Sequence, residues 1–178
     1  MPETTSSLDL ADFIRDVQDF PKPGITFKDI TPLLSSHEAL TACIDRFVDE
    51  YKDKDIDVIA AAEARGFLFA VPLALRLGVG MVPIRKPGKL PFKKHTYDYE
   101  LEYGTDTLEM HVDGIADGQN VLVVDDLLAT GGTVGACCEM IESCNANIVA
   151  CAFLIHLKFL EGAKRLEKYP LFSLVDYT

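Results

Sequence analysis

The sequence lacks a long uninterrupted apolar run, although hydrophobic residues make up 48% of its 178 positions. No stretch approaches the roughly 20 apolar residues that a membrane-spanning helix needs. The first twenty residues carry acidic side chains and no apolar core of the kind found in secretion signals. We therefore expect neither membrane insertion nor secretion, and we expect a cytoplasmic location.

Basic side chains are scarce. Seventeen Lys and Arg residues stand against 28 Asp and Glu residues, which gives a formal net charge of −11 and a pI of about 4.7. The field of such a chain repels phosphate backbones and disfavours non-specific nucleic-acid binding. A small polyanionic substrate would therefore need positive charge concentrated locally.

The five cysteines form no C-x-x-C pair, and their odd number does not indicate a disulfide framework. The four histidines are scattered along the chain and do not combine with the cysteines at zinc-ligand spacing. We expect reduced, mostly buried thiols and no structural metal.

Apolar runs alternate with helical stripes over most of the chain, which fits one globular domain spanning residues 1–178. This alternation predicts an α/β fold with a mainly parallel central sheet flanked by helices. We predict strands over residues 56–62, 81–84, 120–124, 148–155 and 171–175. We predict helices over residues 10–17, 40–51, 67–77, 133–143 and 159–168.

The region between residues 85 and 112 fits neither pattern. Residues 85–95 have no apolar period and contain two prolines and a glycine, which predicts a mobile loop. From Tyr97 to Val112, apolar and aromatic residues alternate with polar ones on either side of Gly104, which predicts a hairpin. Residues 86–104 are thus expected to form a flexible loop and the start of a hairpin.

Residues 121–133, VLVVDDLLATGGT, carry the strongest chemical signal: an apolar strand, two acids, then small residues and glycines that open a helix. Ligands of parallel α/β sheets bind beyond the carboxyl ends of the strands, and a helix N-terminus there favours phosphate. Glycines let the main chain approach phosphate oxygens closely, and the hydroxyls of Thr130 and Thr133 add donors. Asp125 and Asp126 suit sugar hydroxyls.

This segment is not one of the two commonest phosphate loops. No G-x-x-x-x-G-K-[ST] occurs, and the pair Gly78 and Gly80 is followed by Pro83 where a dinucleotide fingerprint needs glycine. The segment resembles the motif that binds phosphoribosyl pyrophosphate (PRPP) in type I phosphoribosyltransferases. The resemblance implies that the acids hold the ribose 2′- and 3′-hydroxyls and that the loop holds the 5-phosphate. The implied ribose and phosphate residues are Asp125, Asp126, Ala129, Thr130, Gly131, Gly132 and Thr133.

A second resemblance extends over nearly the whole chain. Residues 20–32, FPKPGITFKDITP, are similar to the base-binding segment of adenine phosphoribosyltransferases. This implies a type I phosphoribosyltransferase fold with a small N-terminal hood over residues 1–35. It also implies that adenine meets Ile25, Phe27 and Lys28, and that Leu127 covers the other face of the base.

The same resemblance assigns Arg65 and Lys86, each just after a predicted strand, to the pyrophosphate. A planar guanidinium fork and a mobile ammonium group suit its oxygens. One departure is Ala64, where the family commonly has serine.

Glu102 lies in the segment YELEYG, residues 99–104, which is similar to the family's segment beside the reacting ribose and base. Spacing alone leaves three acids equivalent, because strand alternation places Asp98, Glu100 and Glu102 on one face. The resemblance singles out Glu102 as the catalytic residue.

The reaction implied is adenine plus PRPP giving AMP and pyrophosphate, with negative charge needed near the ribose and cations needed at the leaving group. We expect Mg²⁺ as cofactor, held mainly by PRPP and pyrophosphate oxygens, with no protein ligand assigned. The expected partners are adenine, PRPP and a second copy of the chain. The family implies this homodimer, with the segment after Gly66 at its interface.

Two alternatives stay open at this point. A phosphoribosyltransferase for xanthine, hypoxanthine or a pyrimidine would share the PRPP half of the site. Ala129 favours adenine, because enzymes for 6-oxopurines typically carry an acid at this position. A PRPP-sensing regulator without catalysis would need a DNA-binding extension and a basic surface, which this acidic chain does not offer.

Overall fold

The structure is a computed structural model that describes residues 8–101 and 104–178. The chain forms two compact units, and the boundary between them falls between Phe47 and Val48. The single domain with a hood over residues 1–35 stays a prediction. No helix in the described ranges is long and apolar enough to span a membrane.

The first unit contains two short paired strands and short helices. Its elements are η1 (Leu10–Phe13), β1 (Arg15–Val17), β2 (Phe27–Asp29), α1 (Thr31–Ser35) and the larger part of α2 (His37–Tyr51). The helix predicted over residues 10–17 is wrong beyond Phe13. Residues 15–17 pair antiparallel with β2 instead, placing Val17 opposite Phe27, so a strand partner outweighs the local apolar spacing.

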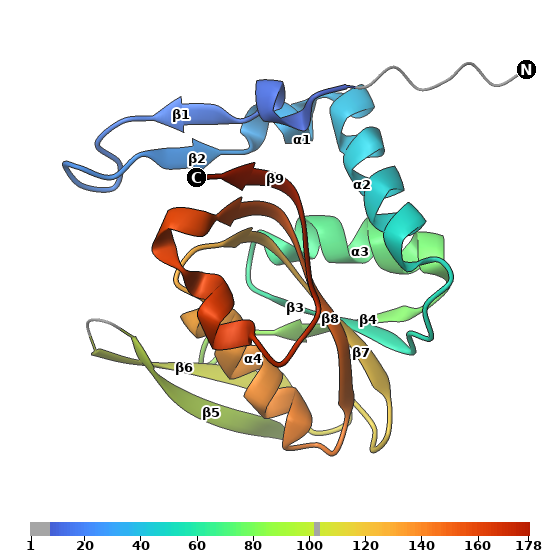
Figure 1. The fold of residues 1–178 in the computed structure, drawn as a ribbon. Coiled ribbons are helices and arrows are strands. Elements are labelled where there is room, and N and C mark those ends of the chain that lie inside the picture. The colour runs from blue at the N-terminus through green and yellow to red at the C-terminus, as the bar shows by residue number, and fades with distance from the viewer. Residues whose placement is uncertain (1–7, 102–103) are drawn as a thin grey trace, which may run out of the picture. The chain divides into compact units, whose positions relative to one another are not determined.

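The second unit is built on a five-stranded parallel sheet in the order β4-β3-β7-β8-β9 (Figure 1). The strands are β3 (Val58–Ala62), β4 (Gly80–Ile84), β7 (Asn120–Leu128), β8 (Asn147–Leu157) and β9 (Leu171–Tyr177). The predicted α/β fold and its five strands are confirmed. β7 continues past the predicted end to Leu128, because Asp125, Leu127 and Leu128 still pair with β8.

Two helices of this unit pack on the sheet. Because the side chains of a strand alternate between the two faces of the sheet, Val58 and Ala60 of β3 point to the same face. The helix α4 (Gly132–Glu142) packs in the core cluster that contains these two residues and Val123. α3 (Gly66–Leu77) contacts β3, β7 and β4 and lies on the other face (Figure 1). Each helix directly follows a central strand, so both helix N-termini lie at the carboxyl edge of the sheet.

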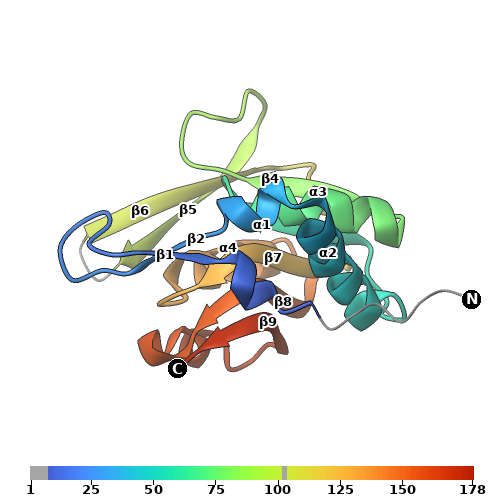
Figure 2. The same ribbon diagram turned by 90° about the horizontal axis from the view of Figure 1, so that it is seen from above.

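The hairpin is confirmed as β5 (Lys94–Leu101) and β6 (Gly104–His111), which pair antiparallel along their full lengths (Figure 2). β5 begins at Lys94, so the last part of the predicted loop is strand. β5 packs against α4, and Tyr99, Leu108 and Met110 extend the core cluster.

The helix predicted over residues 159–168 is wrong. Two 3₁₀ turns, η2 (Lys158–Leu160) and η3 (Gly162–Leu166), take its place. Between them Glu161 has φ 55°, a left-handed conformation that interrupts helical hydrogen bonding. The chain turns at this residue and runs on to β9.

Candidate active site

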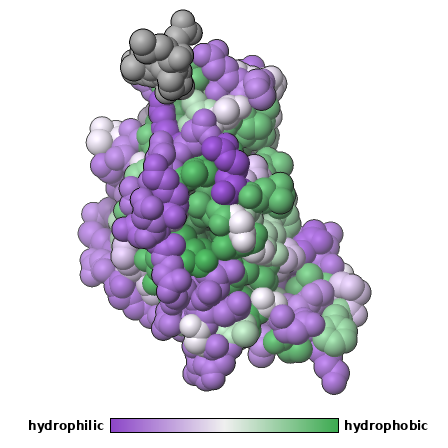
Figure 3. All heavy atoms as spheres, turned by 90° about the vertical axis from the view of Figure 1, so that its right-hand side faces the viewer, coloured by the Kyte–Doolittle hydropathy of each residue, from purple (hydrophilic) through white to green (hydrophobic). Residues whose placement is uncertain are grey.

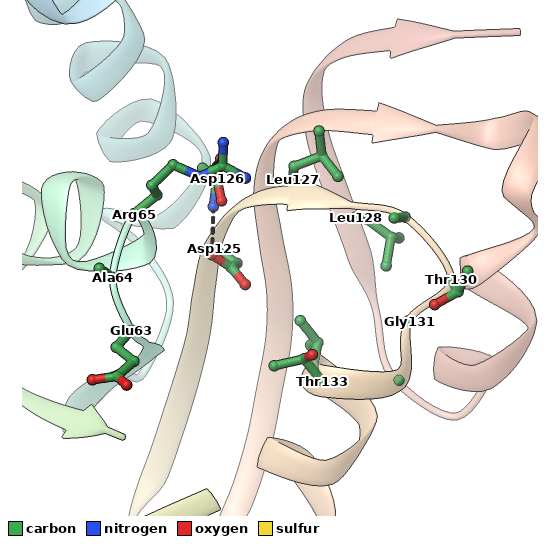
Figure 4. A pocket seen from close by; sticks show the side chains of 13 residues that line it. Glu63, Ala64, Arg65, Asp125, Asp126, Leu127, Leu128, Thr130, Gly131 and Thr133 are labelled. Carbon is green, nitrogen blue, oxygen red and sulfur yellow. Dashed lines mark hydrogen bonds and ion pairs between the residues drawn. The ribbon is translucent and has the colours of Figure 1, made fainter. Parts of the chain in front are cut away.

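A pocket of about 210 Å³ opens at the carboxyl ends of β3 and β7, where the two parallel strands lie side by side (Figure 4). The position is the one expected for ligands of an open parallel sheet. The residues that line it are Glu63, Ala64, Arg65 and residues 125–134. The structure thus brings Arg65 together with every predicted ribose and phosphate residue and with Leu127.

Residues 129–133, called here the glycine loop, connect β7 to α4. Gly131 is the N-cap of α4 and has φ 78°, a left-handed conformation that favours glycine. A helix leaves its first backbone N–H groups without partners inside the helix, and the helix dipole places partial positive charge there. The loop therefore presents backbone donors and the Thr133 hydroxyl at the wall of the pocket.

The two acids at the end of β7 are largely enclosed by protein. The Asp126 side chain is 7% exposed, and its Oδ2 lies 2.9 Å from Arg65 Nε (Figure 4). The Asp126 N–H donates to Asp125 Oδ1 at 2.8 Å. Burial raises the pKa of Asp125 well above its usual range, and the Asp126 charge adds to this. Burial also raises the pKa of Asp126, while Arg65 opposes that rise.

Gly66 allows the close approach of α3 to this acid pair. A Cβ at position 66 would lie 2.9 Å from Asp125 Oδ1 and 3.1 Å from the Val124 carbonyl oxygen. The chain therefore needs glycine directly after Arg65, at the point where α3 begins.

Lys86 does not line the pocket but is linked to its wall. Its ammonium group pairs with the Asp106 carboxylate. The Tyr99 hydroxyl donates to Asp106 Oδ2 at 3.2 Å and lies 3.4 Å from Thr133 Oγ1. Asp106 and Tyr99 had no signal in the sequence beyond the hairpin pattern, because their partners lie on other elements.

Two glutamates fix the start of the segment that follows β4. Glu63 accepts from Arg85 Nε at 2.7 Å and from the Lys86 N–H at 3.1 Å. Glu109 is 5% exposed, and it accepts from the Gly88 N–H at 3.1 Å and from Lys94 Nζ at 2.8 Å. These contacts hold residues 85–88 beside the pocket, and sequence reasoning missed both acids.

The remaining predicted residues are not part of this pocket's lining. Ile25, Phe27 and Lys28 belong to the first unit, where Lys28 Nζ donates to Asp16 Oδ1 at 2.6 Å. The Phe27 ring packs edge-on against Phe20, with 5.1 Å between the ring centroids. Glu102 lies outside the described residues.

The carboxylates that line the pocket, and could hold a hard cation, are those of Glu63, Asp125 and Asp126. Within residues 8–101 and 104–178, no group of three or more His, Cys, Asp or Glu side chains is arranged to hold a metal ion. Oxygen donors of this kind suit Mg²⁺, which usually takes most of its ligands from water and substrate phosphates.

Comparisons with known proteins agree on one family. Residues 29–176 match the phosphoribosyl transferase domain. The chain is 59% identical to the adenine phosphoribosyltransferase of Rhodopirellula baltica, over 96% of this chain and 82% of that protein. It is 55% identical to that of a Roseiflexus species, over 94% and 98%.

Solved structures give the same result. The adenine phosphoribosyltransferase of Thermoanaerobacter pseudethanolicus superposes with a TM-score of 0.92 at 50% identity, covering 94% of this chain and 98% of that one. The Saccharomyces cerevisiae enzyme, complexed with an imino-altritol bisphosphate and adenine, gives a TM-score of 0.87 at 40% identity, over 93% and 96%.

Proposed function

The chain belongs to the phosphoribosyltransferase family and, within it, to the adenine phosphoribosyltransferases of purine salvage, and we propose that the pocket at the ends of β3 and β7 is its PRPP site. The reaction joins adenine to PRPP and releases AMP and pyrophosphate. The observation that carries the proposal is the Arg65–Asp126–Asp125 cluster facing the glycine loop across one pocket.

In this proposal, Asp125 and Asp126 accept hydrogen bonds from the ribose 2′- and 3′-hydroxyls. The glycine loop, from Ala129 to Thr133, binds the 5-phosphate through backbone N–H groups and the Thr130 and Thr133 hydroxyls. The net charge of −11 repels phosphate, and the backbone donors at the helix N-terminus supply a local attraction that offsets this repulsion.

Arg65 and Lys86 bind the pyrophosphate. The Arg65 side chain lines the pocket and is 40% exposed, and its Nε pairs with Asp126. Lys86 reaches the pyrophosphate by leaving Asp106, since a highly charged anion competes with a single carboxylate for the ammonium group. Both cations neutralise the charge that develops on the leaving group.

Mg²⁺ is the proposed cofactor, and the oxygen donors of the acid pair are compatible with it. When bound, it would neutralise negative charge on the pyrophosphate. Asp125 and Asp126 would orient the ribose and contribute outer contacts to the ion.

The adenine contacts rest on the resemblance of residues 20–32. We propose that Phe27 packs on the purine and that main-chain groups at Ile25 and Lys28 read its amino edge. Leu127 contacts the base from the pocket. Ala129 places no acid beside the purine imidazole, which is compatible with a 6-aminopurine.

Glu102 is proposed to stabilise positive charge on the ribose in the transition state or to accept the purine proton. Glu102→Gln keeps the shape of the side chain and removes its charge, so kcat should fall by about 10²-fold with the melting temperature unchanged. The measurement is steady-state AMP formation. The control is Glu100→Gln, an exposed acid of β5 that should retain full kcat. A normal kcat for the Glu102 variant would exclude a catalytic carboxylate there.

The direct test of the activity is AMP formation, measured by chromatography. The purified protein is mixed with PRPP, Mg²⁺ and adenine, hypoxanthine, guanine or xanthine in separate reactions. Product with adenine alone is the expected result. Product only with an oxopurine would be consistent with the proposed PRPP site and would contradict the proposal that the base is adenine. No product with any base would favour a PRPP sensor.

We also propose that the chain forms a homodimer through α3. Leu68, Val71 and Leu75 share one face of this helix and are 45%, 47% and 78% exposed. Figure 3, drawn from the side on which α3 ends in Figure 1, shows apolar side chains exposed among polar ones. Exposed apolar faces of this kind mark association surfaces.

Light scattering should therefore give twice the 19.6 kDa of one chain. Leu75→Glu should shift the protein towards monomer, because a charge would be buried at the interface. A monomeric wild-type protein at micromolar concentration would refute the proposal.

A further inference from the structure

The connection between β8 and β9 packs against the glycine loop through backbone alone. Gly162 opens η3, is buried, and lies against the turn that links β7 to α4. A Cβ built at position 162 would come within 3.0 Å of three backbone atoms: the carbonyl oxygen and carbon of Ala129 and the nitrogen of Gly131. Real Cβ atoms do not approach backbone that closely, so no side chain fits there without movement of the loop.

The contact is reciprocal. A Cβ at Gly131 would lie 2.5 Å from the Gly162 carbonyl oxygen and 3.2 Å from its carbonyl carbon. At each of the two positions, the backbone of the other glycine therefore occupies the space that a Cβ would need. Gly131 and Gly162 are 31 positions apart in the sequence, and their segments touch main chain to main chain.

The need for glycine at 162 does not come from its own backbone conformation. Gly131 has a left-handed φ of 78°, whereas Gly162 is not among the residues with positive φ. An alanine could adopt the backbone of Gly162 without strain. Steric exclusion by the glycine loop is thus the reason for a glycine at this position.

The segment that carries Gly162 is anchored and cannot simply retreat. Leu166, at the end of η3, is 1% exposed and packs in the core cluster together with Tyr169. On the other side, Leu157 ends β8 and is 8% exposed. Between these anchors, left-handed Glu161 turns the chain onto the loop. A side chain at position 162 would therefore push against the backbone of residues 129–131, which it meets first.

We propose that Gly162 is a positioning residue for PRPP. Its backbone supports residues 129–131 from behind, which fixes the direction of the N–H groups that the loop offers to the 5-phosphate. This inference rests on the proposed function of the loop. It predicts that a methyl group at 162, remote from the ligand, selectively weakens PRPP binding, since small misplacements of binding groups have large effects on rate.

The test compares Gly162→Ala with Gly135→Ala. Gly135 lies in α4 beside the same loop, and a Cβ there would meet no atom within 4 Å. For Gly162→Ala, we expect the KM for PRPP to rise about tenfold, with kcat and the KM for adenine changed less than about twofold. Gly135→Ala should match wild type in all three. A PRPP KM equal to wild type in a folded Gly162→Ala protein would overturn the inference.

A second variant keeps the test decisive if the alanine variant does not fold. Glu161→Gly retains the close contact and suits the left-handed conformation, but it loosens the turn that presses residue 162 onto the loop. It should fold, with a PRPP KM raised about threefold and an unchanged adenine KM. An unchanged PRPP KM would count against the inference. Absence of AMP formation by the wild-type protein would instead refute the proposed function.

Discussion

Arg65→Ala is expected to lower kcat/KM for PRPP by about 10³-fold. Two losses combine in this variant. The pyrophosphate loses a cation, and the Asp126 carboxylate, whose side chain is only 7% exposed, loses the guanidinium group 2.9 Å away. Removing one group that stabilises developing charge in the transition state costs about 10²- to 10³-fold in kcat, and the disturbed Asp126 carboxylate adds to this loss.

The same substitution should change the pH dependence of the reaction. Burial already raises the pKa of Asp126, and Arg65 holds it down. Without Arg65 the pKa rises further, so the carboxylate is protonated over a wider range of pH. The acidic limb of the kcat/KM profile should therefore move to higher pH in Arg65→Ala.

Two controls separate charge from geometry. Arg65→Lys keeps the positive charge but loses the planar fork, so it should recover only part of the activity and restore most of the acidic limb. Lys52→Ala removes an exposed cation that is paired with Asp49 on the surface. This variant should leave kcat/KM for PRPP and the acidic limb of its pH profile unchanged. An Arg65→Ala enzyme with normal kcat/KM would show that Arg65 does not contact the pyrophosphate.

The strands and the main pocket could be predicted from the sequence because their signals are local. Residues 58–62 and 120–124 are nearly continuous apolar runs, as expected for strands covered on both faces by helices. The two acids and the glycines follow the second of these strands directly. Parallel pairing alone then brings Arg65, after β3, to the acids at the end of β7.

The secondary-structure predictions are wrong where a contact with a residue distant in the sequence decides the conformation. Residues 15–17 have helical apolar spacing but pair with β2. Residues 159–168 form two 3₁₀ turns because the chain turns at Glu161 and Gly162 rests on the glycine loop. Nothing in either segment taken alone indicates these contacts.

Some residues near the pocket were not predicted from the sequence, and the reason is again that their partners are distant in the sequence. Glu63, Asp106 and Glu109 are paired with cations about 15 to 22 positions away in sequence, which no periodic pattern shows. In the sequence, strand alternation gave Asp98, Glu100 and Glu102 one shared face and no ranking. The resemblance to a family, rather than spacing, selected Glu102.

Asp125→Asn is expected to stabilise the fold while nearly abolishing activity. Asparagine keeps Oδ1, which can still accept the Asp126 N–H bond now 2.8 Å long. It removes a negative charge that burial and Asp126 both disfavour. It also removes the ionised acceptor proposed for a ribose hydroxyl. We expect kcat/KM for PRPP to fall by about 10³-fold, since hydrogen bonds to charged groups contribute about 1.5–3 kcal/mol each and the ribose must also stay aligned.

The pH dependence of the gain in stability follows from the direction of the pKa shift. The pKa of Asp125 lies well above the ordinary value of 3.8. Between the two values the folded protein binds more protons than the unfolded chain, so the free energy of unfolding of wild type falls as pH rises through this window. The destabilisation by the ionised Asp125 carboxylate is complete at pH values above the raised pKa and absent at pH values below the ordinary pKa. At pH values above the raised pKa, the variant should therefore melt at a higher temperature than wild type, and a gain of about 1 kcal/mol would correspond to about 2–4 °C. The difference should vanish towards pH 3.

The matched control is Asp57→Asn at the opposite end of the sheet. Asp57 is exposed, and its Oδ2 accepts the Asn120 N–H at 2.7 Å, so the chemical change is the same in the absence of a buried acid pair. This variant should keep wild-type activity and show no pH-dependent gain in stability. If Asp125→Asn lost activity without gaining stability at high pH, the carboxylate would not be strained by burial, and the raised pKa would not describe the acid pair. If it gained stability but kept activity, Asp125 would not bind the ribose, and Asp126 alone would have to hold the hydroxyls.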